Sequence, residues 1–132
     1  MIKSMRNLLR RQSSKGEEFN WQEKNAELVE LINARKMEAA QVLGQELLDY
    51  VDKKYRKDSR EKATTYNNMG MVFLLTQQYE LAEECFFPAL NMRKRIFGDN
   101  HNEVAVILMN LVQLYKTQAL AILAANRVEI SD

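Results

Sequence analysis

Two asparagines at equivalent positions are the side chains of this sequence whose chemistry points most directly to binding. Asn68 and Asn110 lie at a sequence spacing of 42, and each carboxamide offers two N–H donors and a carbonyl acceptor. Such a group can pair with the backbone of an extended peptide whatever the peptide's sequence. It can equally bond a neighbouring helix of its own chain. Which use applies depends on the elements that carry the two residues.

The other reactive side chains form no catalytic or metal-binding pattern. His101 is the only histidine and Cys85 the only cysteine, and a lone histidine and a lone cysteine make neither a metal site nor a nucleophile–base pair. The four glycines form no phosphate-binding loop. We expect His101 to cap a helix. The sequence predicts a protein that is not an enzyme and holds no metal and no cofactor.

Two basic clusters, residues 53–57 and 93–95, look like phosphate-binding patches. Each falls at the C-terminal end of a predicted helix, where cations complement the helix dipole. Five of the 19 basic residues lie in residues 1–15, which carry no acidic residue, so the remainder of the chain is mildly acidic. We therefore do not expect nucleic acid as a partner.

The elements that carry these residues repeat along the chain. At a constant spacing of 42, positions of one segment return with the same or a similar residue: Ala63 as Ala105, Asn68 as Asn110, and Phe73 as Tyr115. A fixed period in this range indicates stacked supersecondary units. Each such unit cannot bury its apolar face alone, and packing against its neighbours buries a continuous core.

The units are predicted to be helical. Apolar residues recur at spacings of three and four, as in Leu108, Leu111, Val112 and Tyr115, and no segment shows the alternation of a half-buried strand. Gly98 is suited to ending a helix. The pattern predicts an all-α stack of antiparallel helix hairpins, about two and a half repeats long, with helices near residues 21–34, 37–55, 60–75, 79–97 and 102–118.

The C-terminus departs from the repeat. Aligning Ala119 with Ala82 gives a spacing of 37, so about five turn residues are missing after Gln118. The last two helices can then fuse into one rod whose Leu120, Leu123 and Ala124 lack a partner, which favours a homodimer. Alternatively, the segment folds back as a short capping helix.

The middle unit resembles the tetratricopeptide repeat (TPR) family. It has the pattern Tyr66-x2-Met69-Gly70-x2-Phe73, followed by Ala82-x3-Phe86-x2-Ala89. The length of the period and the corner at 96–101 are similar to the kinesin light chain type of repeat. The resemblance divides the chain into a basic N-terminal segment, 1–20, and a TPR-like domain, 21–132, with units near 21–62, 63–104 and 105–132.

The resemblance also implies a function. Proteins of this type hold a peptide or protein segment in a concave groove lined by the first helix of each hairpin, so the partner expected here is a protein or peptide of unknown identity. The implied groove residues are Thr64, Asn67, Asn68, Met71, Met109, Asn110 and Gln113, together with Val106.

The N-terminal segment allows several interpretations. Residues 1–15 can form a basic amphipathic helix that lies on an anionic membrane or docks on the first repeat, and their composition also resembles an organelle transit peptide. We find no stretch of about eighteen apolar residues that would span a bilayer. A membrane is therefore not expected as a partner. The single cysteine allows no internal disulfide, which fits a reducing compartment or indifference to redox. We predict a cytoplasmic protein.

Overall fold

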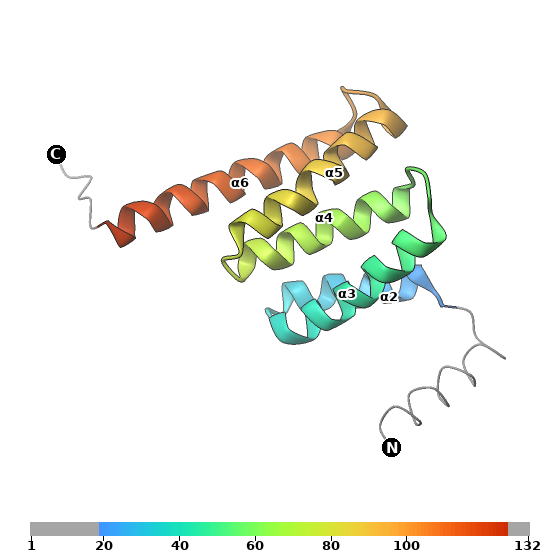
Figure 1. Cartoon of the computed structure of the whole chain (residues 1–132), viewed down its shortest axis with the longest axis horizontal. Helices are drawn as coiled ribbons and strands as arrows, with labels where there is room; N and C mark the ends of the chain where they lie inside the picture. Colours follow the sequence, from blue (N-terminus) through green and yellow to red (C-terminus); the bar gives the residue numbers. More distant parts are fainter. Residues whose placement is uncertain (1–18, 127–132) are drawn as a thin grey trace, which may run out of the picture.

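The computed structural model describes residues 19–126, which form five α-helices and no strand. The helices run side by side in chain order (Figure 1), and the fold is the predicted all-α stack of helix hairpins. The first four lie within one residue of their predicted ranges. Residues 1–18, and with them the predicted amphipathic helix, lie outside the described residues. The helices are α2 (Trp21–Asn33), α3 (Met37–Lys54), α4 (Arg60–Leu75), α5 (Tyr79–Phe97) and α6 (Asn102–Ala125).

The two complete hairpins, α2–α3 and α4–α5, reverse direction by the same turn. Arg35 and Gln77, which occupy equivalent positions of successive units, both have a positive φ, of 58° and 63°. In each turn the next amide closes on the preceding helix: Lys36 N–H bonds Leu31 O at 2.9 Å, and Gln78 N–H bonds the Phe73 carbonyl at 2.8 Å. This pattern is the usual way a helix ends in a left-handed residue. The sequence period is therefore a period of the backbone as well.

Side chains that cap the first turn fix where helices begin. The Ser59 hydroxyl accepts from the Lys62 amide at 3.0 Å at the start of α4. His101 Nδ1 accepts from the Glu103 amide at 3.0 Å at the start of α6, which confirms the capping role predicted for this histidine. Helix α5 ends before Gly98, whose φ of 87° favours glycine.

The core consists of two apolar clusters, and α4 contributes to both. One cluster joins α4 to α2 and α3 through Leu28, Leu47 and Met69. The other joins α4 to α5 and α6 around the fully buried Phe86. Gly70 permits this second contact, since a Cβ there would lie 2.5 Å from the Phe86 ring. The middle hairpin thus holds the stack together on both sides.

Helix α6 is a single rod of 24 residues, so the last two predicted helices are fused and no capping helix folds back within the described chain. Residues 116–118 are helical rather than a turn. The C-terminal half of α6 projects beyond α4 and α5 (Figure 1).

The fusion of the last two predicted helices into α6 also changes the expectation about membrane-spanning segments. Within residues 19–126, α6 is long and apolar enough to cross a membrane by length and composition alone, since an 18-residue window within it has a mean hydropathy of 1.4. The prediction that no segment reaches this threshold was wrong, because it ended the helix at 118 and counted unbroken apolar runs. One face of α6 nevertheless packs into the core of the stack, through Val104, Ile107, Leu111 and Leu114.

Candidate functional site: the surface of the first helices

Helices α2, α4 and α6, the first helix of each unit, are linked by a repeated side-chain bond. Asn68 Nδ2 of α4 donates to Asn25 Oδ1 of α2 at 2.7 Å. Asn110 Nδ2 of α6 donates to Asn67 Oδ1 of α4 at 2.9 Å. The second bond is the first one moved along by one repeat. We call these four residues the amide ladder.

The amide ladder answers the question that the sequence left open for Asn68 and Asn110. Both carboxamides bond a neighbouring helix, which is the second of the two uses considered for them. Each donates one N–H in this bond, and a carboxamide has a second N–H and a carbonyl oxygen besides. Asn68 and Asn110 are half-buried rather than buried, so these remaining groups are not sealed in the core.

Asn25 is a member of the ladder that sequence reasoning missed. It precedes Asn67 by one full repeat, just as Asn68 precedes Asn110. This spacing was visible in the sequence. However, the first unit is degenerate, because Leu28 stands where the middle unit has Gly70. The resemblance to the family pattern therefore gave no reason to align Asn25 with the asparagines of later units.

The other predicted groove residues lie on one face of α4 and α6. Thr64 and Met71 are seven residues apart on α4 and both are half-buried, whereas Gln113 on α6 is exposed. Val106, seven residues before Gln113, is 45% exposed. Residues seven apart return to the same side of a helix. We call Thr64, Met71, Val106 and Gln113 the first-helix face.

Two of the predicted residues lie at the edge of that face rather than on it. Asn67 is buried, with 7% of its surface exposed, because its side chain is turned towards α6. Met109 is equivalent to Asn67 one repeat later and is 72% exposed, since no further helix follows α6 in the described chain. The structure therefore brings Thr64 and Met71 together on α4 and leaves Met109 at the end of the stack.

Arg93 of the second basic cluster is an internal residue. Its guanidinium is buried, donates to the backbone oxygen of Glu103 at 2.9 Å and lies 3.3 Å from the Glu103 carboxylate. It also donates to Thr64 Oγ1 at 3.4 Å. Burial lowers the pKa of Arg93, and the charge of Glu103 opposes that shift. Arg93 thus joins α5 to α4 and α6 and holds Thr64 at the first-helix face.

The described residues contain no group of three or more metal-ligating side chains. Cys85 is buried, and burial followed by the charge of Glu84 raises the pKa of its thiol to about 11. A thiol with so high a pKa carries almost no thiolate near neutral pH and is a poor nucleophile. The asparagines of the amide ladder can form hydrogen bonds on this surface, and Met71 and Val106 can make apolar contacts.

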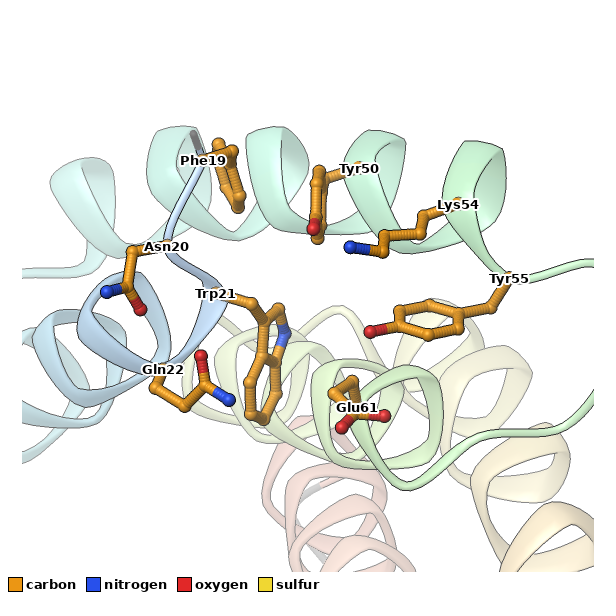
Figure 2. Close-up of a pocket in the computed structure, with 8 residues that line it drawn as sticks. All are labelled: Phe19, Asn20, Trp21, Gln22, Tyr50, Lys54, Tyr55 and Glu61. Carbon is orange, nitrogen blue, oxygen red and sulfur yellow. The ribbon is translucent and has the colours of Figure 1, made fainter. Parts of the chain in front are cut away.

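A pocket of about 290 Å³ at the other end of the stack is lined by none of the predicted residues. Figure 2 shows its aromatic walls, where Phe19 stacks on Tyr50 with ring centroids 4.1 Å apart. Trp21 Nε1 donates to Thr65 Oγ1 at 2.9 Å, which fixes the indole. Lys54 reaches in with its Nζ 5.5 Å from the centroid of the Tyr50 ring. The contacts of Phe19 with Tyr50 and of Trp21 with Thr65 hold the start of α2 against α3 and α4.

Comparison with known proteins identifies the repeat. The family model described as tetratricopeptide repeat matches residues 61–128, just over half of the chain. The match covers nearly all of α4 and continues through α5 and α6, including the C-terminal half of the rod. No curated protein and no solved structure matches the chain.

Proposed function

The chain belongs to the tetratricopeptide repeat family, and on that premise we propose that it is a non-catalytic interaction module that binds an extended peptide or protein segment on its first-helix face. Repeats of this family mediate protein–protein interaction. The proposal adds where the partner lies: across α4 and α6, over Thr64, Met71, Val106 and Gln113.

The observation that carries this proposal is the amide ladder. The same asparagine–asparagine bond joins α2 to α4 and α4 to α6, so the three first helices present one continuous surface. Asn68 and Asn110 lie along it, each with amide groups left for a peptide backbone. Beside them are apolar groups of Met71 and Val106 for side-chain contact. Polar groups that fix an extended chain, next to apolar contacts, are what peptide recognition requires.

The repeat length supports a subtype of the family. We propose a kinesin light chain-like repeat, because the backbone turns at Arg35 and Gln77 and the two ladder bonds all recur at a spacing of 42. The ordinary unit of the family is shorter, at about 34 residues. The longer unit gives longer helices, and α5 has 19 residues.

The binding surface can be tested with side chains that the stack does not need. Val106 and Gln113 are exposed, so the double variant Val106→Ala/Gln113→Ala should keep the helical content and thermal stability of the parent. A peptide selected from a random display library on the parent protein should bind this variant at least tenfold more weakly. A tenfold loss corresponds to about 1.4 kcal/mol.

The matched control is Asn91→Ala, which removes an exposed side chain of α5, on the second-helix side of the hairpin. It should leave peptide affinity unchanged. Unchanged affinity in a folded Val106→Ala/Gln113→Ala variant would show that the peptide binds elsewhere. The ladder variant Asn68→Ala/Asn110→Ala should lose both peptide affinity and some stability, because it also breaks the inter-helix bonds.

Self-association is a second candidate function, and one observation favours it. On the C-terminal half of α6, Leu120 and Ile122 are each 53% exposed, and residues 117–126 carry no charged side chain. Exposed apolar groups on a rod that projects from the stack are typical of a contact with another chain. Sedimentation at tens of micromolar distinguishes a monomer from a dimer.

A further inference from the structure

Helix α6 is the first helix of a unit whose second helix is missing from its expected place. In the middle unit, α5 covers one face of α4, and Ala63 and Gly70 on that face are buried. We call the equivalent residues of α6, namely Ala105, Leu108, Val112 and Tyr115, the open face. Leu108 is 45% exposed, Val112 is 67% exposed and Tyr115 is 42% exposed.

The segment that should cover the open face is present in the chain, but it points away. Ala119 and Leu123 repeat the spacing of Ala82 and Phe86 of α5, and the family match extends to residue 128. In the middle hairpin the turn at Gln77 brings α5 back onto α4. The counterparts of residues 77–81, which form that turn and begin α5, are missing after Gln118, and α6 continues as one helix. The second-helix segment therefore cannot reach its own open face.

We propose that a second copy of the chain supplies the missing cover by reciprocal exchange. The C-terminal half of α6 in each copy, residues 119–125, lies antiparallel on the open face of the other. Every contact then occurs twice, as in a closed two-fold dimer. By analogy with the α4–α5 hairpin, the two-fold axis passes near residues 117 and 118. This proposal deepens the self-association candidate and rests on it.

The side-chain volumes at the crossing point fit the exchange. In the middle hairpin, Gly70 meets Phe86, and a Cβ at Gly70 would lie 2.5 Å from the ring. The equivalent pair in the exchanged dimer is Val112 and Leu123. A larger residue on the first helix is thus matched by a smaller one on the second. Cores tolerate such changes when the total volume is conserved.

The first test restores the missing turn. Inserting the sequence of residues 77–81, QQYEL, between Gln118 and Ala119 gives each chain the turn that α4 and α5 use. The parent, of 15.4 kDa, should sediment as a dimer at tens of micromolar, and the insertion variant should be a monomer with unchanged helicity. The matched control inserts seven helix-forming residues, AEKAAEK, at the same place. Seven residues make about two helical turns, so this control should remain a dimer.

A second test locates the contact between copies. Chains carrying Val112→Cys are mixed with chains carrying Leu123→Cys and oxidised. The mixture should form disulfide-linked dimers, whereas neither variant alone should do so, because each position meets the other across the two-fold axis. Cys85 is buried and should not compete. Cross-linking of Val112→Cys to itself would overturn the exchange.

The remaining outcomes distinguish the exchange from self-association in general and from peptide binding on the first-helix face. A monomeric parent overturns both the exchange and the self-association candidate and leaves the first-helix face untouched. A dimer that survives the QQYEL insertion overturns the exchange alone. If the parent is a monomer but sediments with phosphatidylcholine–phosphatidylserine vesicles, and the insertion variant does not, a membrane rather than a second copy covers the open face, and the proposal is wrong.

Discussion

Helices α4 and α5 bury the face between them, whereas α6, which is built on the same repeat pattern, leaves the equivalent face open. The difference arises from a few residues. The middle unit has a turn with a positive φ at Gln77, and the last unit continues as helix through residues 116–118. Since a hairpin buries apolar surface only if the chain reverses, the loss of one turn converts a closed unit into an open one. The turn therefore decides whether a unit closes on itself.

The largest predicted effect on stability is at Phe86, which packs between α4 and α5 of the middle hairpin. Phe86 is fully buried, so Phe86→Ala should lower the free energy of unfolding by about 3–5 kcal/mol. Leu123, the equivalent residue of the rod, is half-buried. Leu123→Ala should cost about 1 kcal/mol or less when measured at concentrations where the chain is monomeric. Urea denaturation of both variants checks the difference, and equal losses would contradict the comparison.

A smaller effect is predicted at the glycine that admits Phe86. Gly70→Ala places a Cβ 2.5 Å from the ring, and this overpacking should reduce stability by about 1–3 kcal/mol despite the better helix propensity of alanine. The control is Val112→Ala at the equivalent position of α6, which should change stability by about 0.5 kcal/mol at most at concentrations where the chain is monomeric, since that side chain is 67% exposed. A neutral Gly70→Ala would show that Phe86 can move aside.

The amide ladder joins the closed unit to the open one, and breaking it should have a moderate effect. Asn110→Ala removes the bond to Asn67 and should cost about 0.5–1.5 kcal/mol. Amide hydrogen exchange should rise in α6 more than in α4, because α4 is still held by α5. Gln113→Ala, on the same helix but exposed, serves as the control and should leave both readouts unchanged.

The smallest predicted effect is a dependence of the stability of the fold on pH in the acid range. The hydrogen bond from Arg95 holds the pKa of Asp58 below its usual 3.8. A carboxyl whose pKa is lower in the folded state stabilises the fold above its unfolded pKa. This contribution should fade as the pH falls below 3.8 and through the lowered value. In Asp58→Asn, which copies Asn100 of the last unit, the stability should vary less over this acid range. A profile identical to the parent's would mean that the exposed pair contributes nothing.

Much of the fold could be predicted from the sequence because the relevant interactions are local. The ends of α4 and α5 were predicted correctly, since caps and turns such as Ser59 and Gly98 act within a few residues. His101 was correctly predicted to be a cap for the same reason. The role of Arg93 was missed. It was attributed to the helix dipole, but its partners Thr64 and Glu103 lie on two other helices, which no local pattern indicates.

The candidate site was only partly predictable. The repeat placed Asn68 and Asn110 at equivalent positions, yet it did not determine their partners. Each amide bonds an asparagine 43 residues away, and that contact exists only once the hairpins are stacked. The burial of Asn67 and the exposure of Met109 differ for the same reason, since one has a helix beside it and the other lies at the end of the stack.

The sequence by itself determined the helices, their repeat period and the shortened spacing after Gln118, because helix propensity, capping and turn geometry depend on neighbouring residues. Only the tertiary structure decided that the two asparagines bond neighbouring helices, that Arg93 is internal, and that α6 remains one rod with its second face uncovered. Those outcomes depend on which surfaces meet when separate segments pack, and packing is a property of the whole chain.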